Sequence, residues 1–170
     1  WRDNFGEFEK EAAAAASLGQ VHRATTLDGV NVACKLQYPD MQSAIQADLN
    51  QLKILFSMYE RYDKSIQTEH IHKELSERLS EELDYEREAK HTRLYGDILK
   101  DEAGVHVPEI ISELSTSRLL TSTWMEGEQI LNYKDSDIEV RNQLAMNMFR
   151  AWYVPLYHYG GCLLYTSPSP

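Results

Sequence analysis

Two features of this 170-residue sequence could do chemistry that depends on charge: a lysine within an apolar strand and a cluster of acids. Lys35 is the single cation in the segment Asn31–Tyr38, whose residues are mainly apolar. A lysine in such a segment either guards an edge strand against aggregation or is a charge placed for chemistry. A lysine placed for chemistry needs a carboxylate to hold its extended side chain, because a free ammonium is mobile and strongly hydrated.

The acids that could supply this carboxylate lie within residues 77–88. If this segment is helical, a rotation of 100° per residue places Glu81, Asp84 and Glu88 near one face. Like charges at these separations repel, so the cluster favours a nearby cation. The alternative is a solvated helix face, which is the usual role of an acidic run.

A β-hairpin and two helices are the elements that must position these groups. The pair Asp28-Gly29 between alternating runs predicts a hairpin, because both central positions of such a turn favour positive φ. Pro39 closes the second strand, since proline cannot donate to a ladder. Apolar residues then recur at spacings of three and four, which predicts helices over residues 41–62 and from about 68 to 99.

The second half of the chain alternates strand and helix signals. Residues 105–111 and 118–125 read as strands, separated by the turn-rich residues 112–117. The segment Asp135-Ser136-Asp137 is typical of a helix start, and the apolar spacing after it predicts a helix to about His158.

Composition narrows the classes of function. The chain has 17 Lys and Arg against 27 Asp and Glu, for a net charge of −10, which argues against sequence-independent nucleic-acid binding. Its two cysteines make neither a disulfide framework nor a zinc site, so we expect a reducing compartment and a cytoplasmic location. No apolar run approaches the roughly 20 residues that span a bilayer, so we expect no transmembrane segment.

Three stretches together resemble the UbiB/ADCK family of atypical kinase-like ATPases, the ubiquinone-biosynthesis accessory kinases. They are Ala-Ala-Ala-Ser-Leu-Gly-Gln-Val-His-Arg-Ala, Val-Ala-Cys-Lys-Leu-Gln-Tyr-Pro and Glu-Leu-Asp-Tyr-Glu-Arg-Glu-Ala. In that family an alanine-rich loop stands where protein kinases carry a glycine-rich one. Local propensity alone predicts a helix through the five alanines that follow Glu11. The resemblance instead implies that residues 12–17 bend over the nucleotide phosphates.

The resemblance also implies roles for individual residues. Lys35 would pair with Glu88, and the hinge at Trp124, Met125 and Glu126 would meet the adenine edge through its backbone groups. The implied nucleotide-binding residues are Ala14, Ala15, Ala16, Ser17, Lys35, Glu88, Trp124, Met125 and Glu126. Glu82 and Asp84 match the regulatory Glu-x-Asp motif of the family. No histidine spacing indicates a metal site, so we assign no metal ligand.

The fold implied by the resemblance is α+β. Residues 1–126 would form a protein-kinase-like N-lobe, a small antiparallel sheet with long inserted helices. Residues 127–160 would form the hinge exit and the first helices of a helical C-lobe. Residues 161–170 depart from the family, and we interpret them as artefactual or disordered. The His-Gly-Asp-Pro catalytic loop is missing, so we expect an inactive fragment that is truncated at both ends.

The parent protein, by the same resemblance, would bind ATP with Mg²⁺ and support ubiquinone biosynthesis. Its partners would be an adenine nucleotide together with lipid or quinone-biosynthesis proteins at a membrane surface, and nucleic acid would not be among them. Two alternatives stay open. One is a non-catalytic helical interaction domain with Lys35 on an exposed edge, and the other is a small-molecule phosphotransferase.

Overall fold

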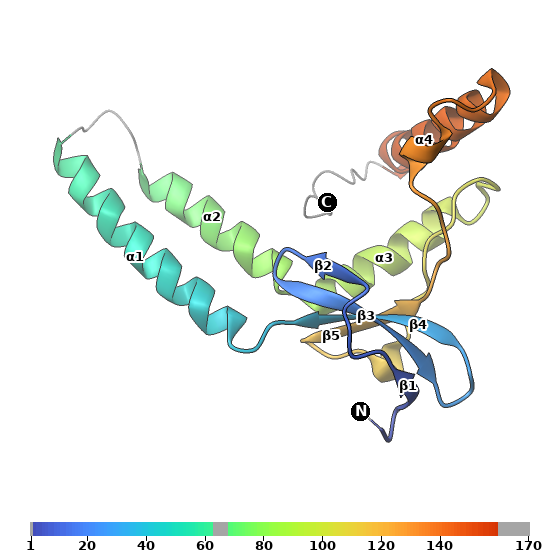
Figure 1. The fold of residues 1–170 in the computed structure, drawn as a ribbon. Coiled ribbons are helices and arrows are strands. Elements are labelled where there is room, and N and C mark those ends of the chain that lie inside the picture. The colour runs from blue at the N-terminus through green and yellow to red at the C-terminus, as the bar shows by residue number, and fades with distance from the viewer. Residues whose placement is uncertain (1, 63–67, 160–170) are drawn as a thin grey trace.

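A small antiparallel sheet with helices projecting from it makes up the part of the chain that the computed structural model describes, residues 2–62 and 68–159. Figure 1 shows α1 and α2 extending from one end of the sheet, with α3 and α4 on the other side. The elements in chain order are β1 (Phe5–Phe8), β2 (Ala14–Ala16), β3 (Gly19–Thr26), β4 (Asn31–Gln37), α1 (Met41–Tyr62), α2 (Thr68–Glu82), α3 (Tyr85–Leu99), η1 (Ser112–Leu114), β5 (Leu119–Thr123), η2 (Ile130–Tyr133) and α4 (Ile138–Tyr159). The predicted α+β class is confirmed.

The predicted hairpin is the centre of the sheet. The strand order is β1-β3-β4-β5, with β2 also paired to β3. The turn differs from the prediction, because Gly29 has a φ of 82° whereas Asp28 does not have positive φ. The amide of Gly29 donates to the Thr26 carbonyl, so a turn followed by one left-handed glycine closes the hairpin.

The alanine-rich segment forms a strand, so the helix that local propensity predicts is wrong. Ala14 pairs with Val21 and Ala16 with Gly19, which makes β2 and β3 a tight hairpin through Ser17. Pairing with β3 satisfies the backbone groups of these alanines, and this tertiary contact outweighs their helix propensity.

The two faces of β4 pack against different partners. Val32 and Cys34 are fully buried in a cluster with Phe5 and Ala24. Because side chains alternate along a strand, Lys35 lies on the opposite face. A second cluster, of Tyr85, Ala89 and Leu120, joins the start of α3 to β5. Helix α3 therefore packs on the same side of the sheet as Lys35.

The predicted helix over residues 68–99 is two helices, α2 and α3. Asp84 interrupts it with φ −88° and ψ 82°, and its side chain accepts a hydrogen bond from the Arg87 amide. This is an N-cap, which starts a new helix in a new direction (Figure 1). The sequence prediction missed the break because the acidic and apolar residues around it are all compatible with a continuous helix.

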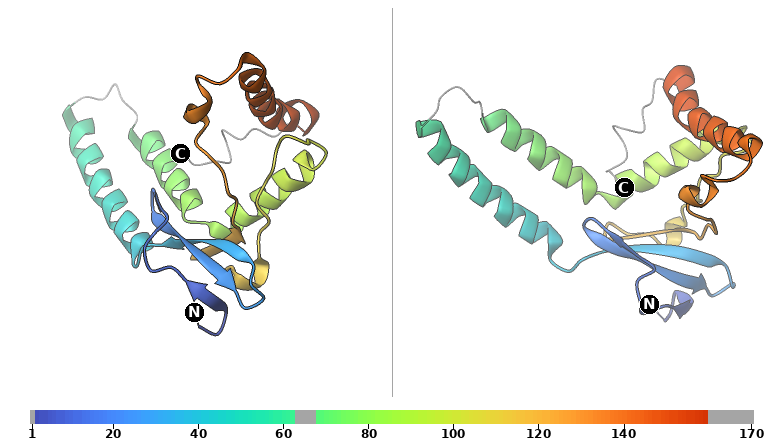
Figure 2. Two further views of the ribbon diagram at one scale, coloured as in Figure 1. Left: turned by 45° about the vertical axis from the view of Figure 1, so that its right-hand side comes forward. Right: turned by 45° about the horizontal axis from the view of Figure 1, so that its top comes forward.

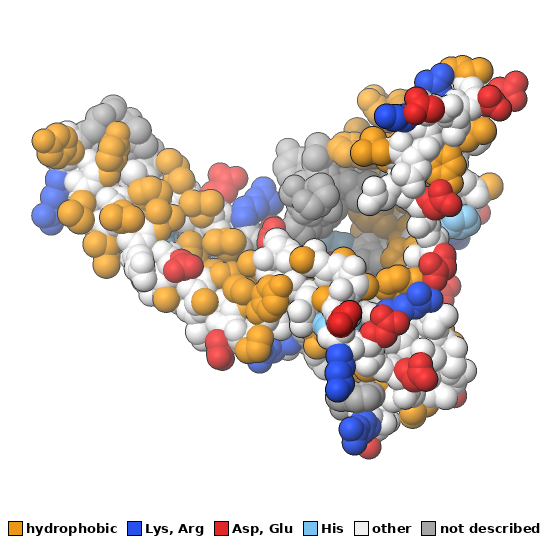
Figure 3. Space-filling model, viewed as in Figure 1, with side chains coloured by type: hydrophobic (Ala, Val, Ile, Leu, Met, Phe, Trp, Pro, Cys, Tyr) orange, Lys and Arg blue, Asp and Glu red, His pale blue; other side chains and the backbone are white. Residues whose placement is uncertain are grey.

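Helices α1 and α2 pack side by side as an arm. Helix α1 has the predicted bounds, and His72 of α2 hydrogen-bonds the Leu49 carbonyl of α1 at 2.9 Å. Figure 3 shows hydrophobic side chains along the surface of this arm. Ile54, Leu55 and Met58 of α1 are exposed. No helix among the described residues has the length and apolarity needed to cross a membrane.

The strand predicted over residues 105–111 is absent. This segment contributes one isolated bridge, between Ile110 and Ser122, and otherwise runs irregularly along the edge of β5. Pro108 lies within it and has no amide hydrogen to donate, which limits regular pairing. The strand predicted over residues 118–125 is confirmed in a shorter form as β5.

Helix α4 confirms the last predicted helix and lies beside the end of α3, as both views of Figure 2 show. Arg150 of α4 forms a two-pronged ion pair with Glu102, in the loop after α3. A Cβ at Gly104 in that loop would lie 2.4 Å from the side chain of Asn147. A larger residue at this position would therefore have to displace the Asn147 side chain. The predicted tail, residues 161–170, lies outside the described residues.

Candidate functional site

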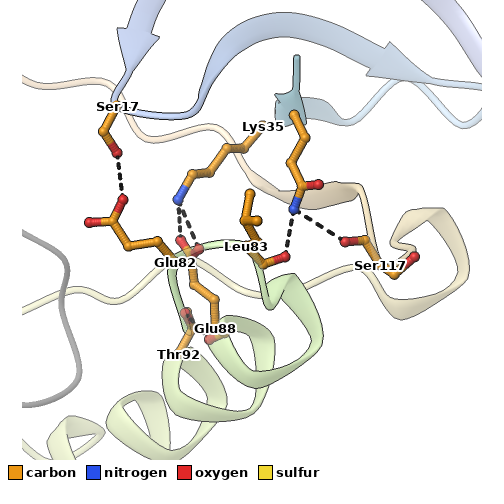
Figure 4. A network of polar contacts seen from close by, with 8 residues as sticks. Ser17, Lys35, Glu82, Leu83, Glu88, Thr92 and Ser117 are labelled. Atoms are coloured by element: carbon orange, nitrogen blue, oxygen red, sulfur yellow. Dashed lines mark hydrogen bonds and ion pairs between the residues drawn. The ribbon is translucent and has the colours of Figure 1, made fainter. Parts of the chain in front are cut away.

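Lys35 and Glu88 lie in direct contact between the sheet and α3 (Figure 4). The Lys35 ammonium donates to both carboxylate oxygens of Glu88, at 2.7 Å and 2.8 Å. The two side chains are 24% and 29% exposed, so the pair is shielded from water on most sides. β4 lies between β3 and β5, so Lys35 is not an edge-strand guard. The structure thus supports the placed-charge interpretation of this lysine.

Tyr85 forms a second support for the lysine. The Lys35 nitrogen lies 5.0 Å from the centre of the Tyr85 ring, within range of a cation–π interaction. The ring is fully buried, and burial, with a smaller contribution from the Glu88 carboxylate, raises the pKa of Tyr85 to about 12. The phenol is therefore neutral around pH 7. The ammonium is held by a carboxylate and by an aromatic face.

The remaining acids of the predicted cluster do not share a cation. Glu81 binds Arg87 at 2.7 Å and Arg78 at 3.3 Å. The hydrogen bond from Arg87 is the main cause that lowers the pKa of Glu81. Asp84 caps α3, and Glu88 binds Lys35. The predicted single acidic face does not exist, because Glu81 belongs to α2, Asp84 lies at the break and Glu88 belongs to α3.

Glu82 joins the alanine-rich hairpin to the end of α2. The Ser17 hydroxyl donates to a carboxylate oxygen of Glu82 at 3.1 Å (Figure 4). Ser17 therefore contacts a carboxylate at the turn between β2 and β3. Gly19, which follows this turn, lies close to the backbone of β4, since a Cβ there would lie 2.1 Å from the Leu36 carbonyl oxygen. Ala14 and Ala15 are exposed.

The predicted adenine-binding segment follows β5. The Trp124 amide donates to the Asn31 carbonyl at 3.0 Å, so this amide is not free for a ligand and that part of the prediction needs correction. The Arg23 guanidinium lies 4.9 Å from the centre of the Trp124 ring and pairs with Glu126 at 2.8 Å. The backbone groups of Met125 make no hydrogen bond with any other described residue.

Sequence reasoning missed Gln37, whose side-chain amide donates to the Leu83 carbonyl at 2.6 Å. Strand alternation could have found it, because Gln37 follows Lys35 by two residues and shares its face of β4. Its acceptor could not have been found, since Leu83 was placed inside a continuous helix.

Comparison with known proteins connects this arrangement to a family. The model of the ABC1 atypical kinase-like domain matches residues 1–162. The chain is 33% identical over 150 residues to atypical kinase COQ8, mitochondrial, of Saccharomyces cerevisiae, covering 88% of this chain and 30% of that protein. It is 34% identical over 143 residues to AarF domain-containing protein kinase 1 of Xenopus laevis, covering 84% of this chain and 27% of that protein.

The fold also matches a solved structure, that of the Rv3197–erythromycin complex from Mycobacterium tuberculosis. The TM-score is 0.71 at 31% identity, over 83% of this chain and 36% of that chain. The chain thus spans about a third or less of the length of these proteins.

Proposed function

The chain belongs to the family of ABC1 atypical kinase-like domains, and from this premise we propose that it is the nucleotide-binding small lobe of such a domain. Lys35 would bind the phosphates of ATP, with Glu88 holding its ammonium in place. Backbone groups of the segment after β5 would bind the adenine edge.

The contact between Lys35 and Glu88 carries this proposal. It joins a strand to a helix 53 residues further along the chain and leaves the ammonium partly accessible. In kinases an ion pair between a strand lysine and a helix glutamate is required for phosphoryl transfer. Because such transfer depends almost wholly on positioning and charge neutralisation, a lysine held at two carboxylate oxygens suits the task.

The alanine-rich hairpin would cover the phosphates. Glycines in such a loop let backbone amides approach phosphate closely, whereas alanine methyl groups restrict φ and crowd that approach. Ala14, Ala15, Ala16 and Ser17 would therefore hold a nucleotide differently from the glycine-rich loop of a protein kinase. We propose ATPase or small-molecule kinase behaviour for the parent, with phosphorylation of other proteins disfavoured.

The described residues fit the nucleotide better than they fit its metal ion. The backbone groups of Met125, to which no other described residue is hydrogen-bonded, suit the adenine edge, and the Lys35 ammonium suits phosphate. Among the side chains that the structure describes, no group of three His, Cys, Asp or Glu residues could hold a metal ion. We therefore assign no Mg²⁺ ligand within the described part. The sequence also lacks the His-Gly-Asp-Pro run, so we propose that the 170-residue chain binds nucleotide without turnover.

Titration of the chain with a fluorescent ATP analogue and Mg²⁺ tests the proposal. We expect Lys35→Met to weaken binding by roughly tenfold or more, because hydrogen bonds between charged groups contribute about 1.5–3 kcal/mol. Lys73→Met is the matched control, since Lys73 is 73% exposed and its ammonium lies 3.9 Å from the carboxylate of Glu77 on the same exposed helix surface. Equal affinity for the Lys35→Met variant and the unaltered chain would refute the proposal.

The role of the parent in ubiquinone biosynthesis is a further part of this proposal, supported by the family membership. A chimaera tests it: residues 2–159 replace the matching segment of yeast COQ8, and quinone content is measured in a strain lacking that protein. We expect quinone to be restored, and to be lost again when the chimaera carries Lys35→Met. A chimaera that is stably produced but restores no quinone would contradict this role.

For location we propose peripheral attachment at a membrane surface. In a eukaryotic parent this surface would be mitochondrial, in keeping with the names of the COQ8 relatives from yeast and zebrafish. In a bacterial parent this surface would be the cytoplasmic face of the membrane. Co-sedimentation with membranes that is reversed by high salt or carbonate is the expected result, and recovery of the parent wholly in the soluble fraction would contradict it.

The first alternative, a non-catalytic helical interaction domain, predicts that Lys35 lies on an exposed edge of the sheet. β4 instead lies between two other strands, and Lys35 is bound to Glu88. The small-molecule phosphotransferase shares the arrangement of a sheet and a helix but would not predict the Glu82-x-Asp84 motif, whose members bind Ser17 and cap α3. Neither alternative is favoured by a contact at this site.

A further inference from the structure

Gln37 is the last residue of β4 and connects the sheet to the junction between α2 and α3. Its side-chain nitrogen donates to the carbonyls of Leu83, at 2.6 Å, and of Ser117, at 3.4 Å. Figure 4 shows both carbonyls as acceptors next to the contact of Lys35 with Glu88. Both acceptors are carbonyl oxygens, so only the NH₂ end of the amide can satisfy them.

The Leu83 carbonyl lies where the chain needs an external donor. It belongs to the residue between the end of α2 and the cap of α3, and the last carbonyls of a helix have no partner within the helix. Among the described residues, the only other donor to this carbonyl is the Tyr85 amide, whose nitrogen lies 3.2 Å from the Leu83 oxygen. Gln37 therefore supplies the stronger of two contacts that hold this carbonyl.

The residues on both sides of Leu83 are those that reach the candidate site. Glu82, immediately before it, binds Ser17 of the alanine-rich hairpin. Glu88, in the first turns of α3, binds Lys35. A shift of the junction relative to β4 would move both carboxylates together, because each is attached to a helix that begins or ends there.

We propose that Gln37 is a positioning residue, which sets the distance between α3 and β4 so that Glu88 meets Lys35. This inference rests on the proposed function, because the quantity that Gln37 would control is the affinity of the site for nucleotide. Lys35 and Gln37 lie on the same face of one strand, so the cation and the anchor of its partner helix have a common, rigid support. Gln37 itself need not touch the nucleotide.

Three variants of the full 170-residue chain test this. Gln37→Leu removes the donor, and Gln37→Glu keeps the shape of the side chain but presents a carboxylate to two carbonyl oxygens at pH 7. At about pH 5 and below, that carboxyl, whose ordinary pKa is about 4.3, begins to gain a proton and can donate again. Gln20→Leu is the matched control, because Gln20 lies on the neighbouring strand and its side chain makes no hydrogen bond with the described residues.

Two measurements are made on each variant. Hydrogen exchange reports the amides of Asp84, Tyr85 and Glu88, each of which is hydrogen-bonded at the junction. Binding of the fluorescent ATP analogue with Mg²⁺ reports the site. For Gln37→Leu we expect roughly tenfold faster exchange and roughly tenfold weaker binding at pH 7. At pH 7, Gln37→Glu should behave like Gln37→Leu. As the pH falls, it should recover both the protection of the junction amides from exchange and the affinity for the analogue. Gln20→Leu should change neither quantity.

Unchanged exchange in Gln37→Leu would overturn the inference, and so would faster exchange with unchanged affinity. A role of Gln37 that does not depend on its hydrogen bonds would not produce the recovery of Gln37→Glu at low pH, so the absence of that recovery also overturns the inference. The Lys35→Met variant separates the two proposals, because it should lose affinity while the junction stays protected. If Lys35→Met keeps full affinity, the proposed function fails and the positioning role fails with it.

Discussion

Separating Lys35 from Glu88 should destabilise the fold by an amount that their partial burial determines. Two unit charges about 4 Å apart attract by about 4 kcal/mol at an effective dielectric constant of 20, and the loss of hydration offsets much of this. Exposed ion pairs contribute only about 0–1 kcal/mol. The pair is 24% and 29% exposed and bidentate, so it lies between these limits. We expect a coupling energy of about 1.5 kcal/mol.

A double-mutant cycle measures this coupling. Lys35→Met keeps most of the apolar stem, and Glu88→Gln keeps the shape of the carboxylate. Each single variant should lower the free energy of unfolding by about 2 kcal/mol, because each leaves one half-buried charge unpaired. The double variant should lose less than the sum of the two. Urea denaturation followed by the fluorescence of Trp124, which lies in the segment after β5, provides the free energies.

The exposed pair of Lys73 and Glu77 provides the control cycle. These side chains are 73% and 64% exposed and 3.9 Å apart at helical spacing, so we expect a coupling of about 0.3 kcal/mol. If the cycle for Lys35 and Glu88 gives no more coupling than this control, the pair is a surface contact and the reasoning about a held ammonium is wrong.

Three further predictions concern close approaches and a buried phenol. Gly19→Ala should destabilise the chain by about 2 kcal/mol in urea denaturation, because its Cβ would lie 2.1 Å from a backbone oxygen that cannot move freely; near-neutrality would contradict this. Gly104→Ala should cost only about 1 kcal/mol and be relieved by adding Asn147→Ala, since the obstacle there is the end of a side chain; an equal loss in the double variant would refute it. The pKa of Tyr85 is raised to about 12, so its contribution to stability is complete below about pH 10 and is lost as the pH rises to about 12. Tyr85→Phe should remove this part of the pH dependence, on the order of 2 kcal/mol, and an unchanged slope between pH 10 and 12 would argue against it.

Local patterns in the sequence predict an element well where interactions between residues close together in the sequence are enough to form it. Helix α1 has the predicted bounds, because an amphipathic spacing maintained over six turns has few other solutions. The hairpin of β3 and β4 follows from a glycine between two alternating runs, although the turn places only Gly29 at positive φ. The break at Asp84 is a different case. Asp84 is an N-cap because α3 starts there and packs on the sheet, and this packing is a tertiary contact that local patterns do not contain.

The sequence by itself determined the types of residue at this site, and through the resemblance it identified Lys35 and Glu88 as partners. Only the tertiary structure decided how they meet. The alanines became a strand because β3 offers backbone partners, and the Trp124 amide became unavailable because β4 takes it. Gln37 acquired its role because the helix ends next to it. Propensity and periodicity act over a few residues, whereas the contacts of Gln37 with Leu83 and of Lys35 with Glu88 join residues 46 and 53 positions apart, so their geometry follows from sheet register and helix packing.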